Sequence, residues 1–131
     1  MIKIVILVYL GGALGAVLRE FFMLMVPTLS RGFPLDILAA NLLAALLLGL
    51  IAGLNRRKIA SAQVYALVGT GMTGGLSTFS SFAYGSAELM TRSATGAIVA
   101  TAYVVTTLTL GYIAAMLGLK VGGQKSDSRR P

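Results

Sequence analysis

The stretch Gly71-Met72-Thr73-Gly74-Gly75-Leu76-Ser77-Thr78-Phe79-Ser80-Ser81-Phe82 decides how this chain folds, because it interrupts an uncharged run over 59–87 that is long enough to cross a membrane. Glycine gives up backbone entropy in a helix, and small hydroxyl residues offer the backbone competing hydrogen bonds. In lipid, such a break is tolerated only where it is buried in protein or lines a watery cavity. The stretch therefore predicts a broken membrane helix, interrupted near Gly74 to Ser77, with freed carbonyl groups of the kind that mark ion sites.

The composition places the whole chain in a bilayer. Its 131 residues are 56% hydrophobic and 11% charged, with a mean hydropathy of +0.86, whereas about a quarter of the residues of a soluble domain are charged. Roughly 20 apolar residues span the hydrocarbon core. We therefore predict an all-α integral membrane protein with four transmembrane helices, drawn from the apolar blocks 4–18, 37–55, 59–87 and 93–119. The first block is short, so its helix either starts near Met1 or carries Arg19 and Glu20 inside its far end.

The residue types that are missing exclude several classes of function. The chain has no cysteine and no histidine, which rules out disulfides, thiolate chemistry and imidazole ligands, and we find no catalytic set. The net charge of +7 comes from short loops and the tail without interleaved aromatic residues, so we expect no nucleic-acid partner. Residues 1–121 are predicted to form one transmembrane channel domain, and 122–131 a disordered polar tail.

The first two predicted helices each carry a polar residue on a narrow face. Gly11 and Gly15 form a small-x-x-x-small pair that allows close helix packing, and Arg19 follows on the same face, where it either lines a vestibule or extends to the interface beside Glu20. Asn41 is the strongly polar residue of the second helix and needs a partner in lipid. Two interpretations stay open for it, an interhelical hydrogen bond and an ion pathway. Asp36 is placed to cap the start of this helix.

The stretch 71–82 resembles the signature of the small bacterial fluoride channels, the Fluc or CrcB-like family, and departs from it only where Ser77 replaces a threonine. The run from Gly11 to Arg19 is similar to the first-helix motif of the same family, and Asn41 matches its second-helix asparagine. The resemblance implies a fluoride-selective channel that passively exports fluoride across the bacterial inner membrane and so protects against its toxicity. It also implies an antiparallel, dual-topology homodimer.

The residues that would conduct an anion are neutral donors and the electropositive edges of aromatic rings. Phe79 and Phe82 are three residues apart, which places both rings on one helical face. Threonines can instead bond their own helix, so packing remains an alternative for the fourth helix. With the resemblance added, the predicted fluoride pathway consists of Asn41, Thr78, Phe79, Ser80, Phe82, Tyr103, Thr107 and Thr109.

Two further assignments concern charge. Arg19 and Glu88 are predicted vestibule residues, although Glu88 can equally form a solvated pair with Arg92 one turn later. The resemblance implies a structural Na⁺ held by backbone carbonyl groups, which maps onto Gly74 and Ser77. One chain offers too few oxygens for such a cage, so a dimer with the break on its twofold axis is expected to complete it.

Two other functions compete with a channel. A small multidrug-resistance-type, proton-coupled exporter also has four spans and forms dimers, but it needs a carboxylate deep in its first helix, where Glu20 lies near the end. A helical assembly subunit would leave the glycine break and the phenylalanine pair unexplained. The loop charges raise a separate conflict, because the positive-inside rule predicts both termini in the cytoplasm whereas the resemblance implies both orientations.

Overall fold

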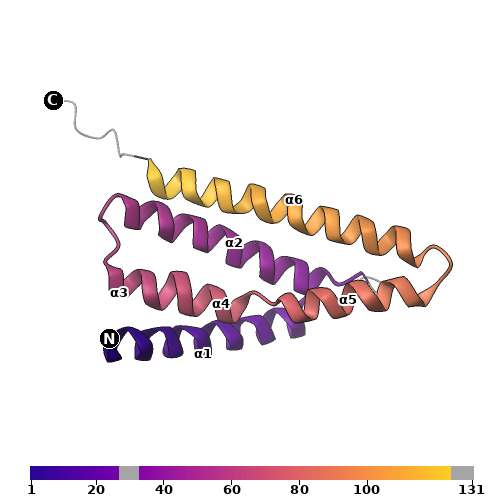
Figure 1. The fold of residues 1–131 in the computed structure, drawn as a ribbon, viewed down its shortest axis with the longest axis horizontal. Coiled ribbons are helices and arrows are strands. Elements are labelled where there is room, and N and C mark those ends of the chain that lie inside the picture. Colours follow the sequence, from indigo (N-terminus) through magenta and orange to yellow (C-terminus); the bar gives the residue numbers. More distant parts are fainter. Residues whose placement is uncertain (27–32, 125–131) are drawn as a thin grey trace.

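The computed structural model describes residues 1–26 and 33–124, and the regular secondary structure of this part of the chain is entirely helical (Figure 1). The elements are α1 (Ile2–Met25), α2 (Leu35–Arg56), α3 (Ala62–Val64), the π-helix η1 (Tyr65–Met72), α4 (Thr73–Leu76), α5 (Phe79–Arg92) and α6 (Gly96–Gly123). Successive passes of the chain, formed by α1, α2, the segment from α3 to α5, and α6, run in opposite directions, so that the N-terminus and the end of α6 lie at the same end of the molecule (Figure 1). The expectation of an all-α, four-helix architecture is confirmed.

Three helices, α1, α2 and α6, are long and apolar enough to cross a membrane. The third pass is divided among α3, η1, α4 and α5, none of which is long enough alone. α1 starts next to Met1 and also contains Arg19 and Glu20, so both alternatives that the sequence allowed for the first helix are realised together. Gly122 and Gly123 extend α6 into the segment assigned to the tail, and 125–131 lies outside the described residues.

Glycines bring two pairs of helices into backbone contact. In the first seam, a methyl group on Gly11 would overlap the Leu67 carbonyl oxygen of η1, and one on Gly15 would overlap that of Met72. The predicted small-residue pair is therefore a packing surface. A second seam joins α2 to α6, where Gly118 lies against the carbonyl oxygen of Leu46 and Gly49 against that of Ala115.

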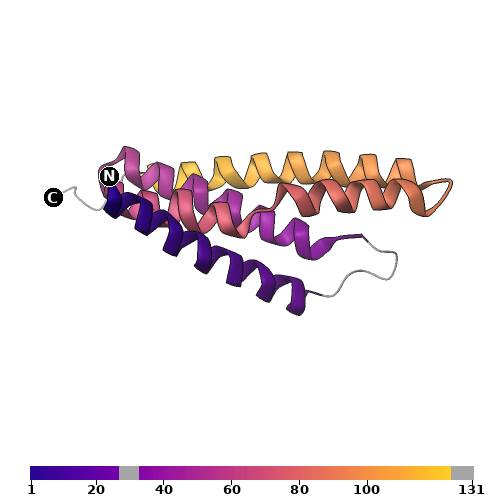
Figure 2. The ribbon, with the colours of Figure 1, turned by 60° about the horizontal axis from the view of Figure 1, so that its bottom comes forward.

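The third pass is broken between α4 and α5, where the ribbon loses its coil (Figure 2). Ser77 (φ −74°, ψ 150°) and Thr78 (φ −144°, ψ 111°) are extended, and the Thr78 side chain caps α5 by accepting a hydrogen bond from the Ser81 N–H. The prediction of a broken third helix is confirmed, but Gly74 is still helical. The interruption falls at the hydroxyl residues rather than at the glycines because a hydroxyl can replace a helical hydrogen bond, whereas glycine only weakens one.

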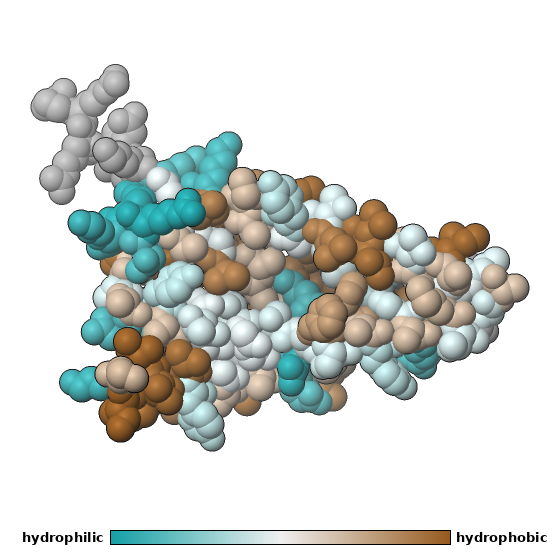
Figure 3. Space-filling view, in the orientation of Figure 1, coloured by the Kyte–Doolittle hydropathy of each residue, from teal (hydrophilic) through white to brown (hydrophobic). Residues whose placement is uncertain are grey.

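The surface is apolar over most of its length. Large apolar side chains of α1 and α6 are exposed, among them Val17 (68%) and Leu108 (63%), as expected of helices that face lipid or another protein. Hydrophilic residues gather at the end where α6 finishes (Figure 3). At that end the Arg57 guanidinium donates a hydrogen bond to the Gln124 carbonyl, so the α2–α3 turn is joined to the end of α6.

Candidate functional site

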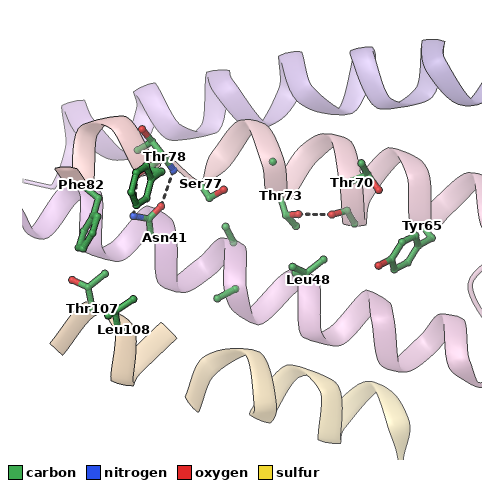
Figure 4. Close-up of a pocket in the computed structure, with 15 residues that line it drawn as sticks. Asn41, Leu48, Tyr65, Thr70, Thr73, Ser77, Thr78, Phe82, Thr107 and Leu108 are labelled. Carbon is green, nitrogen blue, oxygen red and sulfur yellow. Dashed lines mark hydrogen bonds between the residues drawn. The ribbon is translucent and has the colours of Figure 1, made fainter. Parts of the chain in front are cut away.

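A groove of about 650 Å³ runs beside the break, between α2, the third pass and α6 (Figure 4). Its lining is neutral: among the described residues no charged side chain contributes to it. The polar groups are hydroxyls and one amide, and the rest of the wall is aliphatic, aromatic or glycine. The lining residues are Asn41, Ala44, Ala45, Leu48, Tyr65, Gly69, Thr70, Thr73, Gly74, Ser77, Thr78, Phe79, Phe82, Thr107 and Leu108.

Asn41, on the neighbouring helix α2, forms hydrogen bonds with the backbone at the break. Its Oδ1 accepts a hydrogen bond from the Thr78 N–H at 2.8 Å, and its Nδ2 donates to the Thr78 carbonyl at 3.4 Å (Figure 4). Asn41 thus supplies an acceptor for the Thr78 N–H, which the break separates from its helical carbonyl. The interhelical partner that Asn41 needs is therefore the extended backbone at Thr78, and the same amide lines the groove.

Side chains at the break release two carbonyl groups from their helical partners. In a continuous helix the Thr78 N–H would donate to the Gly74 carbonyl, but it donates to Asn41 instead. Likewise the Ser81 N–H donates to the Thr78 hydroxyl at 3.2 Å rather than to the Ser77 carbonyl. The oxygens of Gly74 and Ser77 thus lose the donors that an unbroken helix would give them, and both residues are exposed in the single chain.

Aromatic rings form a row that leads from the groove into the protein. The Phe79 and Phe82 centroids are 6.0 Å apart, and Phe82 contacts Tyr103 of α6 at 5.5 Å. Phe33 meets the other side of Tyr103 edge-on, with 5.2 Å between centroids. The two phenylalanines share a face as predicted, but their surroundings differ: Phe79 is 81% exposed, whereas Phe82 packs between the groove and Tyr103.

Two buried hydroxyls on α6 have no hydrogen-bond partner among the described residues. They are Tyr103 OH and Thr107 Oγ1, which lie one helical turn apart on a common face. Tyr103 is fully buried and Thr107 is 8% exposed, and Thr107 lines the groove. Most threonines of a membrane helix satisfy their hydroxyl on their own backbone, as Thr101 does with Ala97 at 2.8 Å. Of these two residues only Thr107 lines the groove, and the Tyr103 side chain lies behind Phe82, against which its ring packs.

Comparison with known proteins agrees with this architecture. A family model described as "CrcB-like protein, Camphor Resistance (CrcB)" matches residues 6–119. The chain belongs to the CrcB-like family. It is 53% identical over 127 residues to a protein of Brucella melitensis named fluoride-specific ion channel FluC 2, a match that covers 97% of this chain and 47% of the relative.

A second relative is close to this chain in length. The fluoride-specific ion channel FluC 3 of Yersinia pseudotuberculosis is 48% identical over 120 residues, which is 92% of this chain and 89% of the relative. The chain spans about half the length of the Brucella relatives that it matches. As a CrcB-like protein it is a multi-pass membrane protein, and the three long apolar helices agree with that.

Several residues that the family resemblance singles out lie outside the groove lining. Thr109 is exposed on α6, and Ser80 is exposed on α5 with its hydroxyl 3.3 Å from that of Thr78. Arg19 and Glu88 are partly buried on α1 and α5, and neither contributes to the groove. The structure thus brings together Asn41, Thr78, Phe79, Phe82 and Thr107 at the groove, with Tyr103 directly behind, and the roles of all these residues remain predictions.

The structure adds groove residues from η1 and its junction with α4 that the sequence did not single out. Tyr65, Thr70 and Thr73 extend the hydroxyl lining along this CrcB-like protein's third pass (Figure 4). The Thr73 hydroxyl is satisfied within its own pass, since it donates to the Gly69 carbonyl at 2.5 Å. Tyr65, Gly69 and Thr73 recur at i, i+4 and i+8, a spacing that a helical period of 3.6 also brings to one side of the helix. The spacing and the hydroxyls were thus a signal in the sequence, although the same pattern fits a packed face.

Proposed function

We propose that this protein is a fluoride channel that passively exports fluoride across the bacterial inner membrane. The observation that carries the proposal is the neutral groove at the break, where an amide, hydroxyl donors and aromatic ring edges lie together without a charged side chain among the described lining residues. Such groups attract an anion weakly and at several points, which favours rapid passage over capture. The names of the relatives supply the identity of the ion.

The pathway in this proposal begins at Asn41 and Thr78 and continues along the aromatic row. Asn41 Nδ2 and the Thr78 hydroxyl are donors at the break, and the rings of Phe79 and Phe82 present edges beside them. The unpartnered hydroxyls of Thr107 and Tyr103 then continue the donor series into α6. Ser80 and Thr109 extend it at either end, and Arg19 and Glu88 serve as vestibule charges.

The active form in this proposal is an antiparallel homodimer with a structural Na⁺ at its centre. Gly74 and Ser77 suit such an ion because their carbonyl oxygens have lost helical donors, and the space beside Gly74 is open within the protomer. Hard oxygen ligands are those that Na⁺ prefers. Two oxygens from each of two protomers give the ion a cage that one chain cannot provide, and the ion's role there is to hold the two breaks together.

A proton-coupled exporter is the alternative, and the arrangement of α1 argues against it. Such a mechanism uses a carboxylate inside the membrane that exchanges a proton for a cationic drug. Glu20, the acid of α1, is exposed and lies outside the groove. The groove itself offers a cation no carboxylate from the described residues.

Flux from liposomes tests the proposal. Purified protein reconstituted in vesicles loaded with potassium fluoride is expected to release fluoride rapidly on addition of a potassium ionophore, measured with a fluoride electrode. Chloride-loaded vesicles are the matched control for selectivity, and uptake of a cationic drug driven by a pH gradient measures the exporter activity. Drug uptake without fluoride release would replace the proposed function by the alternative.

A further inference from the structure

Lys58 has a backbone conformation that normally belongs to glycine. Among the described residues it is the one non-glycine residue with a positive φ, at 58°. The turn that it forms after α2 is a Schellman motif, in which the Lys58 N–H donates to the Asn55 carbonyl at 2.8 Å and the Ile59 N–H donates to the Leu54 carbonyl at 3.0 Å. Glycine is usual at this position because a Cβ is unfavourable there. The stability of the turn therefore does not explain why the residue is a lysine, and such an outlier points to a function.

The turn after α2 is held against the end of α6. The Arg57 guanidinium donates a hydrogen bond to the Gln124 carbonyl. One helical turn earlier, a methyl group on Gly53 would overlap the Leu119 carbonyl oxygen of α6. Lys120, the residue after Leu119, therefore belongs to the same end surface as the turn, where hydrophilic residues gather (Figure 3).

This end surface is positively charged. Arg56, Lys58 and Lys120 are all exposed, and we call these three residues the basic end. The acidic residues of the described chain all lie toward the opposite end of the molecule: Glu20, Asp36 and Glu88. No acid within the described residues therefore neutralises the basic end, and its charge is available to a negatively charged partner.

Exposed apolar side chains border the basic end. Ile59, next to Lys58, is 60% exposed, and Val121, next to Lys120, is 61% exposed. In a protein that spans a membrane, charged residues at the ends of the helices lie at the level of the lipid headgroups, and apolar residues beside them face the acyl chains. A free anion would use the charges alone. A phospholipid uses both kinds of group, so the surface favours a lipid.

We propose that the basic end binds the headgroup of an anionic phospholipid. Arg56, Lys58 and Lys120 attract the headgroup phosphate, and Ile59 and Val121 contact the acyl chains. The Schellman turn gives the Lys58 side chain a fixed origin on this surface, which is the use of its unfavourable backbone conformation. Each protomer carries the whole site, so the proposal does not depend on which ion the protein conducts.

Native mass spectrometry of the full chain, titrated with phosphatidylglycerol or with phosphatidylcholine of the same acyl chains, tests the site. The wild type should bind phosphatidylglycerol at least about tenfold more tightly, because each nearby lysine or arginine contributes about fivefold. Lys58→Gly and Lys120→Gln should each weaken phosphatidylglycerol binding about fivefold and leave phosphatidylcholine binding unchanged. Lys58→Arg keeps the charge and should keep the preference.

Arg92→Gln is the matched control, because Arg92 ends α5 at the opposite end of the molecule. It removes one positive charge and should leave phosphatidylglycerol binding unchanged. An equal loss in Arg92→Gln and Lys58→Gly would mean that net charge alone attracts the lipid, which overturns the proposal. Inorganic phosphate in excess should not displace the lipid, and displacement by phosphate would show a site for a free anion instead.

Thermal unfolding in detergent without lipid separates the role of Lys58 in binding from a role in the fold. Lys58→Gly should unfold at the wild-type temperature or above, since glycine adopts the left-handed conformation readily. Added phosphatidylglycerol should raise the unfolding temperature of the wild type more than that of Lys58→Gly. A Lys58→Gly protein that is less stable than wild type would mean that the lysine supports the fold. That result, or equal affinity of the wild type for the two lipids, would overturn the proposal.

Discussion

Phe79 and Phe82 illustrate how two identical residues on one helical face come to have different surroundings. Phe82 is packed against Tyr103, so part of its contribution is to the fold. Phe79 is 81% exposed in the single chain, where an apolar ring gains nothing from packing. Because the edge of a phenyl ring is electropositive, the exposed ring beside the groove is the better candidate for contact with an anion.

Replacing each ring by an aliphatic side chain separates packing from ion contact. Phe79→Ile and Phe82→Ile should lower fluoride efflux at least about tenfold while the protein remains folded, since hydrophobic swaps of similar volume usually cost less than about 1.5 kcal/mol of stability. Efflux is measured with a fluoride electrode and assembly by size-exclusion chromatography. The Phe79 variant should keep wild-type stability, whereas the Phe82 variant loses its contact with Tyr103 and should be somewhat less stable.

Asn41→Asp replaces the amide that contacts the break by a carboxylate of nearly the same shape. The aspartate can still accept the Thr78 N–H, but it cannot donate to the Thr78 carbonyl, and its charge faces the groove. We expect efflux to fall at least about tenfold through repulsion of the anion, together with a stability loss of about 1 kcal/mol from the missing hydrogen bond. If folded Asn41→Asp and both phenylalanine variants all release fluoride at the wild-type rate, the ion does not pass through this groove.

Helix number and type and the region of the break were predictable from the sequence, whereas the exact residues that leave the helix were not. The apolar blocks between charges predicted four helices because the hydrocarbon core dictates their length. The break was predicted near Gly74 to Ser77, and the extended residues are Ser77 and Thr78, because Asn41 of α2 replaces a helical hydrogen bond of Thr78. Local helix propensity does not reveal a contact between residues that lie so far apart in the chain.

The candidate site also contains residues that the sequence predicted and residues that it did not. Asn41, Thr78, Phe79 and Phe82 were predicted from the motif and its spacing, and they do meet at the groove. Tyr65 was missed because helical spacing alone does not distinguish a groove-lining side chain from a packed one. The prediction that Asp36 caps α2 is wrong, because Pro34 takes the N-cap position and no side chain makes a capping hydrogen bond.

Substitutions at Gly74 and Ser77 test the exposed carbonyl groups of the break. No atom lies within 4 Å of a Cβ built on Gly74, so Gly74→Val should not clash within the protomer. A loss of dimer stability that exceeds the few tenths of a kcal/mol expected for a β-branched residue in a helix would therefore arise between protomers or at the bound ion. We expect such a loss, and only a small effect from Ser77→Ala, because backbone oxygens are the proposed ligands.

Dimer dissociation in detergent, with Na⁺ replaced by N-methylglucamine, is the matching measurement. Wild type and Ser77→Ala should dissociate more readily without Na⁺, whereas Gly74→Val should already do so in its presence. If the wild-type dimer dissociates equally with and without Na⁺, and diffraction data show no ion between the breaks, the proposal of a structural cation is wrong.

The distribution of charge gives the molecule two unlike ends. Lys3, Arg56, Arg57, Lys58 and Lys120 all belong to the end where α1 starts and α6 finishes (Figures 1 and 3). By the positive-inside rule, this end should face the cytoplasm. The antiparallel dimer that we propose needs copies in both orientations, so the two arguments predict different outcomes for the same protein.

Labelling of the termini decides between them. A single cysteine added at the C-terminus, in a chain that otherwise has none, should react with a membrane-impermeant maleimide from both faces of the membrane if the dimer is antiparallel. Protein in inverted vesicles and in intact spheroplasts would each be labelled to about half. Complete protection in spheroplasts would show that loop charge fixes one orientation and that the antiparallel dimer is wrong.

The two glycine seams can close only after much of the chain has been synthesised. Each seam joins a helix to a partner that the ribosome produces much later, α1 to η1 and α2 to α6. Until the last helix is released into the membrane, α2 has no surface against which its glycines can close. An incomplete chain, halted during translation or cut short by a stop codon, therefore leaves bare backbone facing lipid. Such chains should be ready substrates for membrane proteases, so that cellular quality control can distinguish them from the finished protein.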